Sequence, residues 1–201
     1  MSALAELYGK IATCKDCEEL ARTRTQVVPG EGPENTQIVF IGEAPGFNED
    51  QQGRPFVGQA GQFLDQLLNS IGLKRKDVYI CNVIKCRPIG NRDPLPMEIK
   101  NCQKWLDLQL ELLSPKMVVT LGRYSLAKFF PGEPISKVHG KARKQNNVIY
   151  FAMYHPAAAL HQQSLRQTIE EDMRKIPALL AQAEKVEEVK EVEKPQQLSL
   201  F

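Results

Sequence analysis

Long apolar runs are absent from the 201-residue sequence. No stretch approaches the roughly 20 apolar residues that span a bilayer, so the sequence predicts no membrane-spanning helix. Residues 1–10 lack the basic start and the apolar stretch of a secretory signal, and we therefore expect a cytoplasmic protein. The sequence also lacks a large excess of one charge, since it contains 26 Lys and Arg residues and 24 Asp and Glu residues. The net charge of +2 does not by itself indicate a nucleic-acid partner.

The composition that is present is typical of a globular domain. Hydrophobic residues make up 42% and charged residues 25% of the chain, whose length suffices for one domain with a core but not for two of full size. Residues 184–195 hold five acidic residues and three Lys, which leaves a positive surplus on the rest of the chain. That surplus permits an anionic partner. We expect a folded domain over residues 1–183 and a charged flexible linker over residues 184–196.

Short apolar segments alternate with amphipathic stretches along the chain. The apolar segments are residues 37–41, 78–83, 117–121 and 148–153. Apolar residues at helical spacing mark residues 59–71, 97–113, 123–130 and 165–180, the last with a bend expected at Pro177. This alternation predicts an α/β fold with a parallel sheet covered by helices on both faces. Sites in such sheets lie in the loops after the strands, which here are residues 42–58, 85–96, 122–124 and 154–160.

Five cysteines are present, and two of them form a C-x-x-C motif at Cys14 and Cys17. The motif precedes every predicted strand, which is unlike a thioredoxin-type redox site. Two thiols at this spacing can hold one metal centre, and Cys86 and Cys102 could complete four ligands for zinc or for a 4Fe–4S cluster. The alternative is a chance motif with buried cysteines. Cys81 lies inside a predicted strand and is expected in the core.

The loops after the predicted strands carry the candidate site residues. Gly42-Glu-Ala-Pro-Gly46 brings backbone amides close to a ligand, although it could also be an ordinary turn. Phe56, in Gly53-Arg-Pro-Phe-Val-Gly58, is either a core plug or a stacking platform for a flat ligand. Asn82 both donates and accepts hydrogen bonds, so it can read the edge of a base. His155, between a strand and a proline, is either structural or functional.

Taken together, these motifs resemble those of a family 4 (type-4) uracil-DNA glycosylase. The resemblance covers about residues 7–180, and four ordered motifs with four ordered cysteines are far more specific than any one of them. They are Gly42-Glu-Ala-Pro-Gly46, Gly53-Arg-Pro-Phe-Val-Gly58, Asn82-Val-Ile-Lys-Cys-Arg-Pro88 and His155-Pro156, with Cys14, Cys17, Cys86 and Cys102. The resemblance implies a three-layer α/β/α sandwich around a four-stranded parallel sheet, and a 4Fe–4S cluster held by the four cysteines.

The resemblance implies chemical roles for four of the loop residues. Glu43 would position the attacking water, and His155 would face uracil O2, where negative charge gathers as the bond breaks. Phe56 would stack on uracil, and Asn82 would read its polar edge. The implied activity hydrolyses the N-glycosidic bond of a uracil flipped out of single- or double-stranded DNA and leaves an abasic site.

The remaining motif residues would shape the pocket. Gly42 and Ala44 are implied as backbone contacts, and Glu49 as the acid that crowds C5 and excludes the methyl group of thymine. Ala157 departs from the pattern, because many relatives have Ser after His-Pro, and backbone amides or nearby bases must replace that contact with a phosphate. Residues 88–96 contain no His, unlike a related group that attaches covalently to uracil, so we expect ordinary turnover.

Lysines are absent from the motifs around Gly42, Phe56 and His155, which predicts a monofunctional enzyme without a Schiff base or strand cleavage. Basic residues elsewhere are expected to contact the DNA backbone, so that binding weakens with salt. They are Lys85, Arg87, Lys137, Lys141 and Arg143. Two other functions stay open: a non-catalytic DNA-binding module whose cluster senses redox state, and a cluster-bearing hydrolase of a free nucleotide.

The last five residues resemble the short peptide by which bacterial repair and replication proteins bind the DNA sliding clamp. An extended peptide that places Leu and Phe side chains in an apolar groove is a common recognition mode. The preceding linker, with Pro195, would hold the peptide away from the folded domain, which we expect to be a monomer. The alternative is a tail without function. The peptide consists of Gln197, Leu198, Ser199, Leu200 and Phe201.

Overall fold

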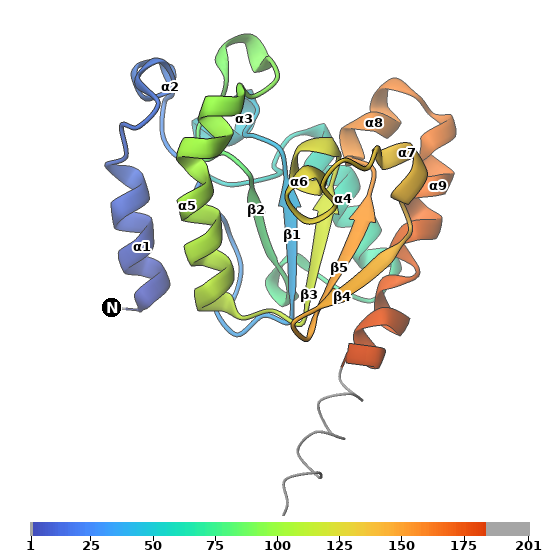
Figure 1. Ribbon diagram of the computed structural model, residues 1–201. Coiled ribbons are helices and arrows are strands. Elements are labelled where there is room, and N and C mark those ends of the chain that lie inside the picture. Colours follow the sequence, from blue (N-terminus) through green and yellow to red (C-terminus); the bar gives the residue numbers. More distant parts are fainter. Residues whose placement is uncertain (1, 184–201) are drawn as a thin grey trace, which may run out of the picture.

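The computed structural model describes residues 2–183 (Figure 1). These residues form a five-stranded sheet in the order β2-β1-β3-β5-β4. The strands are β1 (Ile38–Gly42), β2 (Tyr79–Asn82), β3 (Met117–Leu121), β4 (Ala142–Gln145) and β5 (Val148–Met153). β1 pairs in parallel with β2 and β3, and β3 pairs in parallel with β5. The four strands predicted from the sequence and their parallel arrangement are therefore confirmed.

The fifth strand, β4, corrects the predicted strand count of four. It pairs antiparallel with β5 at the edge of the sheet, and its residues Ala-Arg-Lys-Gln are all exposed. A strand without buried apolar residues lacks the short apolar segment on which the prediction relied. Asn146 and Asn147 connect the two strands, and both have positive φ, 49° and 66°. Tight hairpin turns favour Asn at such positions, so this pair was the available signal in the sequence.

Helices fill the connections between the strands. They are α1 (Ala3–Ala12), α2 (Glu18–Thr23), α3 (Phe47–Gln52), α4 (Gln59–Ser70), α5 (Pro96–Leu113), α6 (Arg123–Phe129), α7 (Ile135–Val138), α8 (Pro156–His161) and α9 (Ser164–Met173), with short 3-10 helices at Arg75–Asp77 and Ile89–Asn91. α4, α5 and α6 were predicted. The last predicted helix is broken rather than bent, because α9 ends at Met173 and a second helical segment covers residues 176–183. Pro177 lies in the first turn of that segment, where its missing N–H is tolerated.

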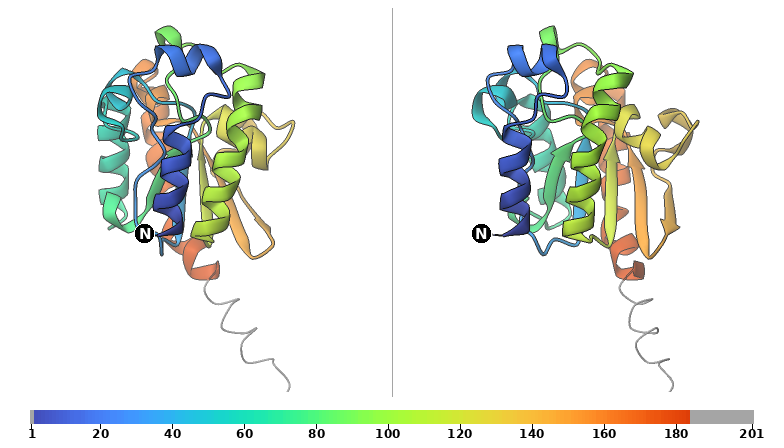
Figure 2. Two further views of the ribbon diagram at one scale, coloured as in Figure 1. Left: turned by 90° about the vertical axis from the view of Figure 1, so that its left-hand side faces the viewer. Right: turned by 60° about the vertical axis from the view of Figure 1, so that its left-hand side comes forward.

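The sheet has a separate hydrophobic core on each face. Successive side chains of a strand point to opposite faces. In β1, Ile38 and Phe40 join the core that includes α4 and α9, whereas Val39 and Ile41 join the core that includes α1 and α5. α1 and α5 lie side by side on their face (Figures 1 and 2). This arrangement confirms the predicted three layers.

The parallel strands all end at the upper edge of the sheet in Figure 1. The loops that follow them gather at this edge, and α3 and α8 begin there, at Phe47 and Pro156. The fold therefore brings the candidate motifs to one end of the molecule. Within residues 2–183, no helix is long and apolar enough to cross a membrane.

Candidate active site

A cleft of about 760 Å3 opens at the edge where the parallel strands end. This volume is typical of pockets that bind small molecules. Its wall includes residues from all four predicted loops. Gly42 lies against two of the residues that line the cleft. The predicted pocket residues in the wall are Glu43, Ala44, Glu49, Phe56, Asn82 and His155.

Gly42 allows two side chains of the cleft to meet. It ends β1 and lies opposite Asn82, which ends β2. A Cβ atom at Gly42 would lie 2.4 Å from Oδ1 of Asn82 and 2.6 Å from the ring of Phe56. Any other residue would push these side chains apart, so the close approach requires glycine. The backbone contact of Gly42 with a ligand stays a prediction.

The side chain of Asn82 presents an unpaired acceptor. The residue is 1% exposed, and its Oδ1 has no hydrogen-bond partner among residues 2–183. A buried acceptor left unpaired costs about 1–3 kcal/mol. A ligand with a suitably placed donor would remove this cost. Asn82 therefore offers a buried acceptor in the wall of the cleft.

Phe56 combines a buried ring with an unusual backbone. Its side chain is 5% exposed, belongs to a hydrophobic core and also lines the cleft, so the two interpretations of this residue are compatible. The ring stacks on the imidazole of His155, with centroids 5.3 Å apart and an angle of 28° between the planes. The φ of Phe56 is +52°, and such a conformation costs a non-glycine residue about 1–3 kcal/mol. Neighbouring groups must therefore hold Phe56 in place.

Glu49 fastens the loop that carries Phe56. Its Oε1 accepts hydrogen bonds from the backbone N–H groups of Val57 and Gly58, each over 2.9 Å. Its Oε2 accepts from the N–H of Gly46 over 3.1 Å. Three backbone donors thus engage the carboxylate. The predicted contact of Glu49 with C5 of uracil stays a prediction.

His155 is a neutral imidazole near pH 7. Desolvation lowers its pKa to about 4, and the carboxylate of Glu49 has a smaller, opposing effect. The Nδ1 atom accepts a hydrogen bond from the backbone N–H of Ala157 over 3.1 Å. The single ring proton therefore lies on Nε2. The ring can donate one hydrogen bond to a ligand without carrying a charge.

Glu43 has a raised pKa. Burial is the main cause, the carboxylate of Asp93 adds to it, and the guanidinium of Arg123 opposes it. Asp93 and Arg123 pair with each other at the rim of the cleft, with 2.5 Å between Oδ2 and Nη2. A carboxylate whose pKa is raised towards neutral pH is suited to accept a proton from water.

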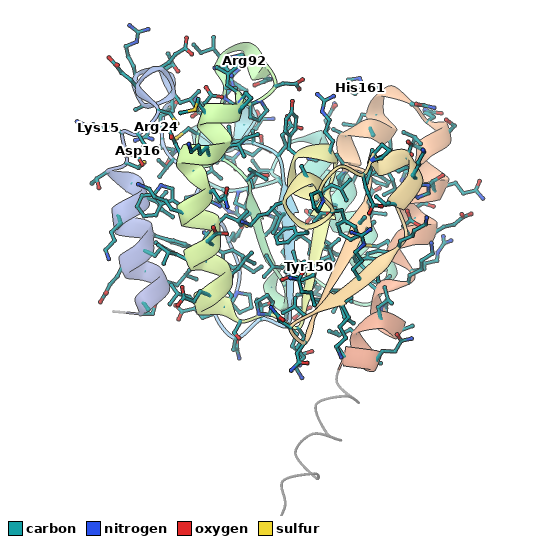
Figure 3. The ribbon with its side chains drawn as sticks, in the orientation of Figure 1. Lys15, Asp16, Arg24, Arg92, Tyr150 and His161 are labelled. Atoms are coloured by element: carbon teal, nitrogen blue, oxygen red, sulfur yellow. The ribbon has the colours of Figure 1, made fainter. Side chains whose placement is uncertain are left out.

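Asp93 and Arg123 were not among the residues selected from the sequence. Arg123 follows Gly122 at the end of β3, and Asp93 lies in the loop after β2. Both positions belong to the predicted site loops, which was the available signal. Arg92 and His161 also line the cleft and lie at the same end of the molecule (Figure 3).

The four cysteines selected from the sequence line one cavity. Cys14 and Cys17 follow α1, Cys86 lies in the loop after β2, and Cys102 lies in α5. All four are free thiols. Among residues 2–183, no three His, Cys, Asp or Glu side chains are close enough together to hold a single metal ion. Four thiols that line one cavity form a donor set that both zinc and a 4Fe–4S cluster accept.

Hydrogen-bond donors are directed at these sulfur atoms. Arg24, between α2 and α5 in Figure 3, donates from Nη1 to Sγ of Cys86 over 2.9 Å. Trp105 donates from Nε1 to Sγ of Cys14 over 3.4 Å. Thiolates that bind metals are commonly stabilised by such donors, so the surroundings fit a thiolate-bound group. Cys81, in contrast, lies in the core, as predicted.

One predicted contact with the DNA backbone is wrong. Lys85 is 1% exposed, and its ammonium group donates to the backbone carbonyl of Asn82 over 2.7 Å. Its side chain turns inwards beneath the loop, so a phosphate cannot reach it. Lys137, Lys141 and Arg143 are exposed, on α7 and on the hairpin of β4.

Two other predicted DNA contacts have partners within the protein. The guanidinium of Arg87 lies 5.0 Å from the ring centroid of Phe47, and its Nε donates to Oδ1 of Asn91. Arg143 pairs with Glu133. Contact of either arginine with DNA stays a prediction.

The region that forms the cleft matches a known family. The model of the Uracil DNA glycosylase superfamily matches residues 29–180. The chain belongs to this superfamily. The matched region contains every predicted cleft residue of this glycosylase-superfamily protein. Cys14 and Cys17 precede the matched region.

The superfamily member is similar over most of its length to type-4 uracil-DNA glycosylases. It is 47% identical to that of Sulfurisphaera tokodaii over 189 residues, which cover 89% of this chain and 86% of the relative. It is 45% identical to the enzyme of Archaeoglobus fulgidus over 188 residues, which cover 89% of this chain and 94% of the relative. It is 42% identical to the enzyme of Thermotoga maritima over 176 residues, which cover 85% of this chain and 91% of the relative. The resemblance derived from the motifs is therefore confirmed.

Proposed function

We propose that this chain hydrolyses the N-glycosidic bond between uracil and deoxyribose in DNA, releasing uracil and leaving an abasic site. The observation that carries the proposal is the unpaired Oδ1 of Asn82, buried beside Phe56. The N3–H group of uracil supplies the donor that this acceptor lacks. Cytosine has an unprotonated N3, which would leave two acceptors facing each other. The pocket thus selects uracil by its hydrogen-bonding edge.

Substrate binding requires the base to leave the helix, which costs a few kcal/mol. Stacking on the ring of Phe56 offsets about 1–3 kcal/mol of this cost. Asn82 fixes the orientation of the base in its plane. Glu49 lies in the wall of the cleft and excludes the methyl group of thymine from C5.

Bond cleavage places negative charge on uracil O2 and positive charge on the sugar. Neutral His155 donates from Nε2 to O2, and this hydrogen bond strengthens as the charge develops. Glu43 orients a water molecule towards C1′ and accepts its proton as the water oxygen bonds to C1′. The electron pair of the glycosidic bond leaves with uracil. Hydrolysis therefore proceeds without an attacking lysine and without strand cleavage.

The cysteines Cys14, Cys17, Cys86 and Cys102 hold a 4Fe–4S cluster in this proposal. Four thiols that line one cavity, with donors directed at two of the sulfur atoms, support a thiolate-bound group at this place, and the resemblance of the motifs favours a 4Fe–4S cluster over zinc. When bound, the cluster would cross-link the segment after α1 to the loop after β2 and to α5, and so stabilise the folded chain.

Basic residues bind the DNA backbone in this proposal. Lys141 lies beside Ala152 near the end of β5, Lys137 lies in α7, and Arg87 and Arg143 add to them. The predicted linker and the clamp-binding peptide, residues 184–201, lie outside the described residues, and their proposed roles rest on the sequence. Action as a cytoplasmic monomer belongs to the same proposal.

The test is release of uracil from oligonucleotides that contain one uracil, in single- and double-stranded form. We expect free uracil and an abasic site, with an intact strand until alkali is added, and no release of thymine or cytosine. Cleavage of a free deoxyuridine nucleotide alone would favour a nucleotide hydrolase, and binding without release would favour a non-catalytic module. Asn82→Ala should abolish excision, whereas Asn69→Ala, an exposed position on α4, should not.

A further inference from the structure

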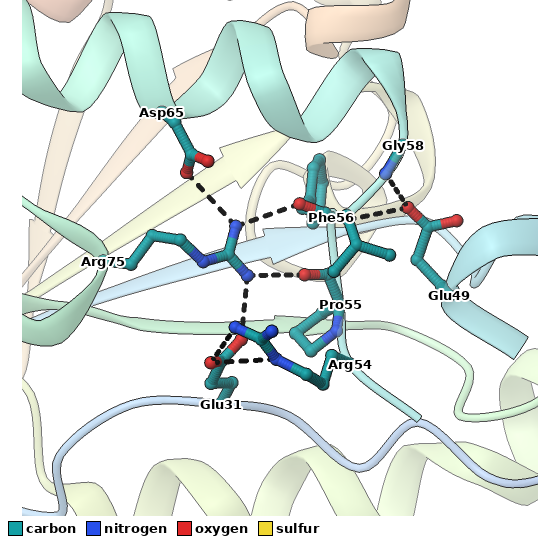
Figure 4. Close-up of polar contacts among 9 residues, drawn as sticks. Glu31, Glu49, Arg54, Pro55, Phe56, Gly58, Asp65 and Arg75 are labelled. Atoms are coloured by element: carbon teal, nitrogen blue, oxygen red, sulfur yellow. Dashed lines mark hydrogen bonds and ion pairs between the residues drawn. The ribbon is translucent and has the colours of Figure 1, made fainter. Parts of the chain in front are cut away.

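The backbone on both sides of Phe56 is held by side chains from distant parts of the chain (Figure 4). Arg75 donates from Nη1 to the carbonyl of Phe56 over 2.9 Å, and from Nη2 to the carbonyl of Pro55 over 2.6 Å. On the other side, Glu49 accepts from the two N–H groups that follow Phe56. A residue with positive φ persists only where its surroundings fix it. These contacts provide that fixation.

Arg75 is itself fixed by two carboxylates. Its Nη2 lies 2.9 Å from Oε2 of Glu31, and its Nη1 lies 3.2 Å from Oδ1 of Asp65. Glu31 is tied to β2 through a backbone bridge with Ile80, and Asp65 lies in α4. The guanidinium is thus connected to a strand and to a helix, two rigid elements. Through its two carbonyl contacts it extends this rigidity to the loop.

The close approach of α4 reinforces the same geometry. A Cβ atom at Gly61 would lie 1.8 Å from the carbonyl oxygen of Phe56. The helix therefore packs directly against the peptide group that Arg75 binds. Phe56 also lines the cleft, and its ring stacks on His155.

We propose that Arg75 is a positioning residue for uracil recognition: it holds Phe56 in the left-handed conformation that presents the ring to the flipped base. The inference rests on the proposed function. Arg75 does not line the cleft and acts through Phe56. Its planar fork serves two carbonyls and two carboxylates at once, which the single ammonium group of lysine cannot do.

The experiment compares Arg75→Gln and Arg75→Lys with the unmodified chain. Arg54→Gln is the matched control, because Arg54 also pairs with Glu31 but contacts neither carbonyl. Excision is followed in single turnovers with saturating enzyme, and inhibition by free uracil measures base binding without DNA. Both Arg75 variants should show about tenfold slower excision and about tenfold weaker inhibition. A loss of this size corresponds to losing part of the stabilisation that stacking on an aromatic ring provides. Arg54→Gln should remain near the unmodified chain.

Two further measurements separate positioning from a merely structural role. The affinity for DNA with an abasic site, which has no base to stack, should be unchanged in the Arg75 variants. In the Phe56→Ala background, Arg75→Gln should cause little further loss of rate, because the ring through which it acts is gone.

Multiplicative effects of Arg75→Gln and Phe56→Ala, or an equal loss of affinity for abasic DNA, would overturn the inference. If Arg75→Gln fails to fold, Arg75→Lys is assessed by the same criteria. An unmodified chain that releases no uracil would refute the proposed function instead. An active chain with unimpaired Arg75 variants would refute only the positioning role.

Discussion

The backbone N–H of Ala157 donates a hydrogen bond to Nδ1 of His155 over 3.1 Å. Because the donor is a backbone group, the side chain at position 157 is not needed to set the tautomer of the imidazole. Ala157 therefore leaves the proton on Nε2, where the proposed reaction needs it. Ala157→Ser should leave this tautomer unchanged.

His155→Ala should slow excision about a hundredfold to a thousandfold, as expected for the loss of one donor to a developing oxyanion. Binding of uracil-containing DNA should change much less, because the hydrogen bond strengthens only as charge develops. Single-turnover rates and binding isotherms measure the two effects. Equal losses in rate and in binding would remove His155 from the catalytic role.

The rate of excision should fall on the acid side at a pH above the ordinary glutamate pKa of 4.5, because burial raises the pKa of Glu43 and the reaction uses its carboxylate. Asp93→Asn removes a neighbouring negative charge and should move the acid limb to lower pH. Arg123→Gln removes a positive charge and should move it to higher pH. Single-turnover pH profiles check both shifts, and movement in the same direction would contradict the role of Glu43.

Cys102→Ala should reduce iron from about four atoms per chain to near zero and lower the melting temperature. Cys81→Ala is the matched control, since Cys81 is buried in the core but does not line the cysteine cavity, and this variant should retain iron. Metal analysis and visible absorbance measure the outcome. Stoichiometric zinc without iron in the unmodified protein would refute the cluster.

Lys141→Gln should weaken DNA binding. It should also reduce the magnitude of the slope of the logarithm of the binding constant against the logarithm of the salt concentration by about one. Lys85→Met should leave that slope unchanged and lower the melting temperature, because the buried ammonium group binds the carbonyl of Asn82. Binding titrations at several salt concentrations distinguish the two. A reduced slope for Lys85→Met would restore Lys85 as a DNA contact.

Removal of residues 197–201 should abolish binding to a bacterial sliding clamp and leave excision on a short oligonucleotide unchanged. The peptide's apolar side chains would occupy a groove of the clamp and take no part in the chemistry. Affinity in the micromolar range is expected, because fixing a short peptide in one conformation on binding costs free energy. No binding of the full chain at tens of micromolar, or loss of excision on truncation, would contradict this role.

The parallel strands could be predicted because each is a short apolar segment buried on both faces. β4 could not, since its four exposed residues owe their conformation to pairing with β5. α3 and α8 were missed for a related reason. They are six residues long and begin within the site loops, so they show little helical periodicity.

The cleft residues could be predicted because they follow strand ends and belong to recognisable motifs. Side-chain direction was harder to predict. Lys85 lies in a loop where a lysine is normally exposed, and only the fold shows that it turns inwards. Arg75, in a short run of charged residues, resembles a solvated surface group. Its contacts are with carbonyls 19 and 20 residues earlier, which no local pattern reveals.

Both edges of the sheet in residues 2–183 carry features that disfavour pairing with further strands. On the outer side of β2, Glu31 exchanges two backbone hydrogen bonds with Ile80, of 2.9 and 2.8 Å. At the other edge, β4 exposes Arg143 and Lys144. An open edge would offer its unpaired N–H and C=O groups to another chain, and covering segments and charged side chains prevent this. Both edges of the described sheet therefore disfavour aggregation by intermolecular strand addition.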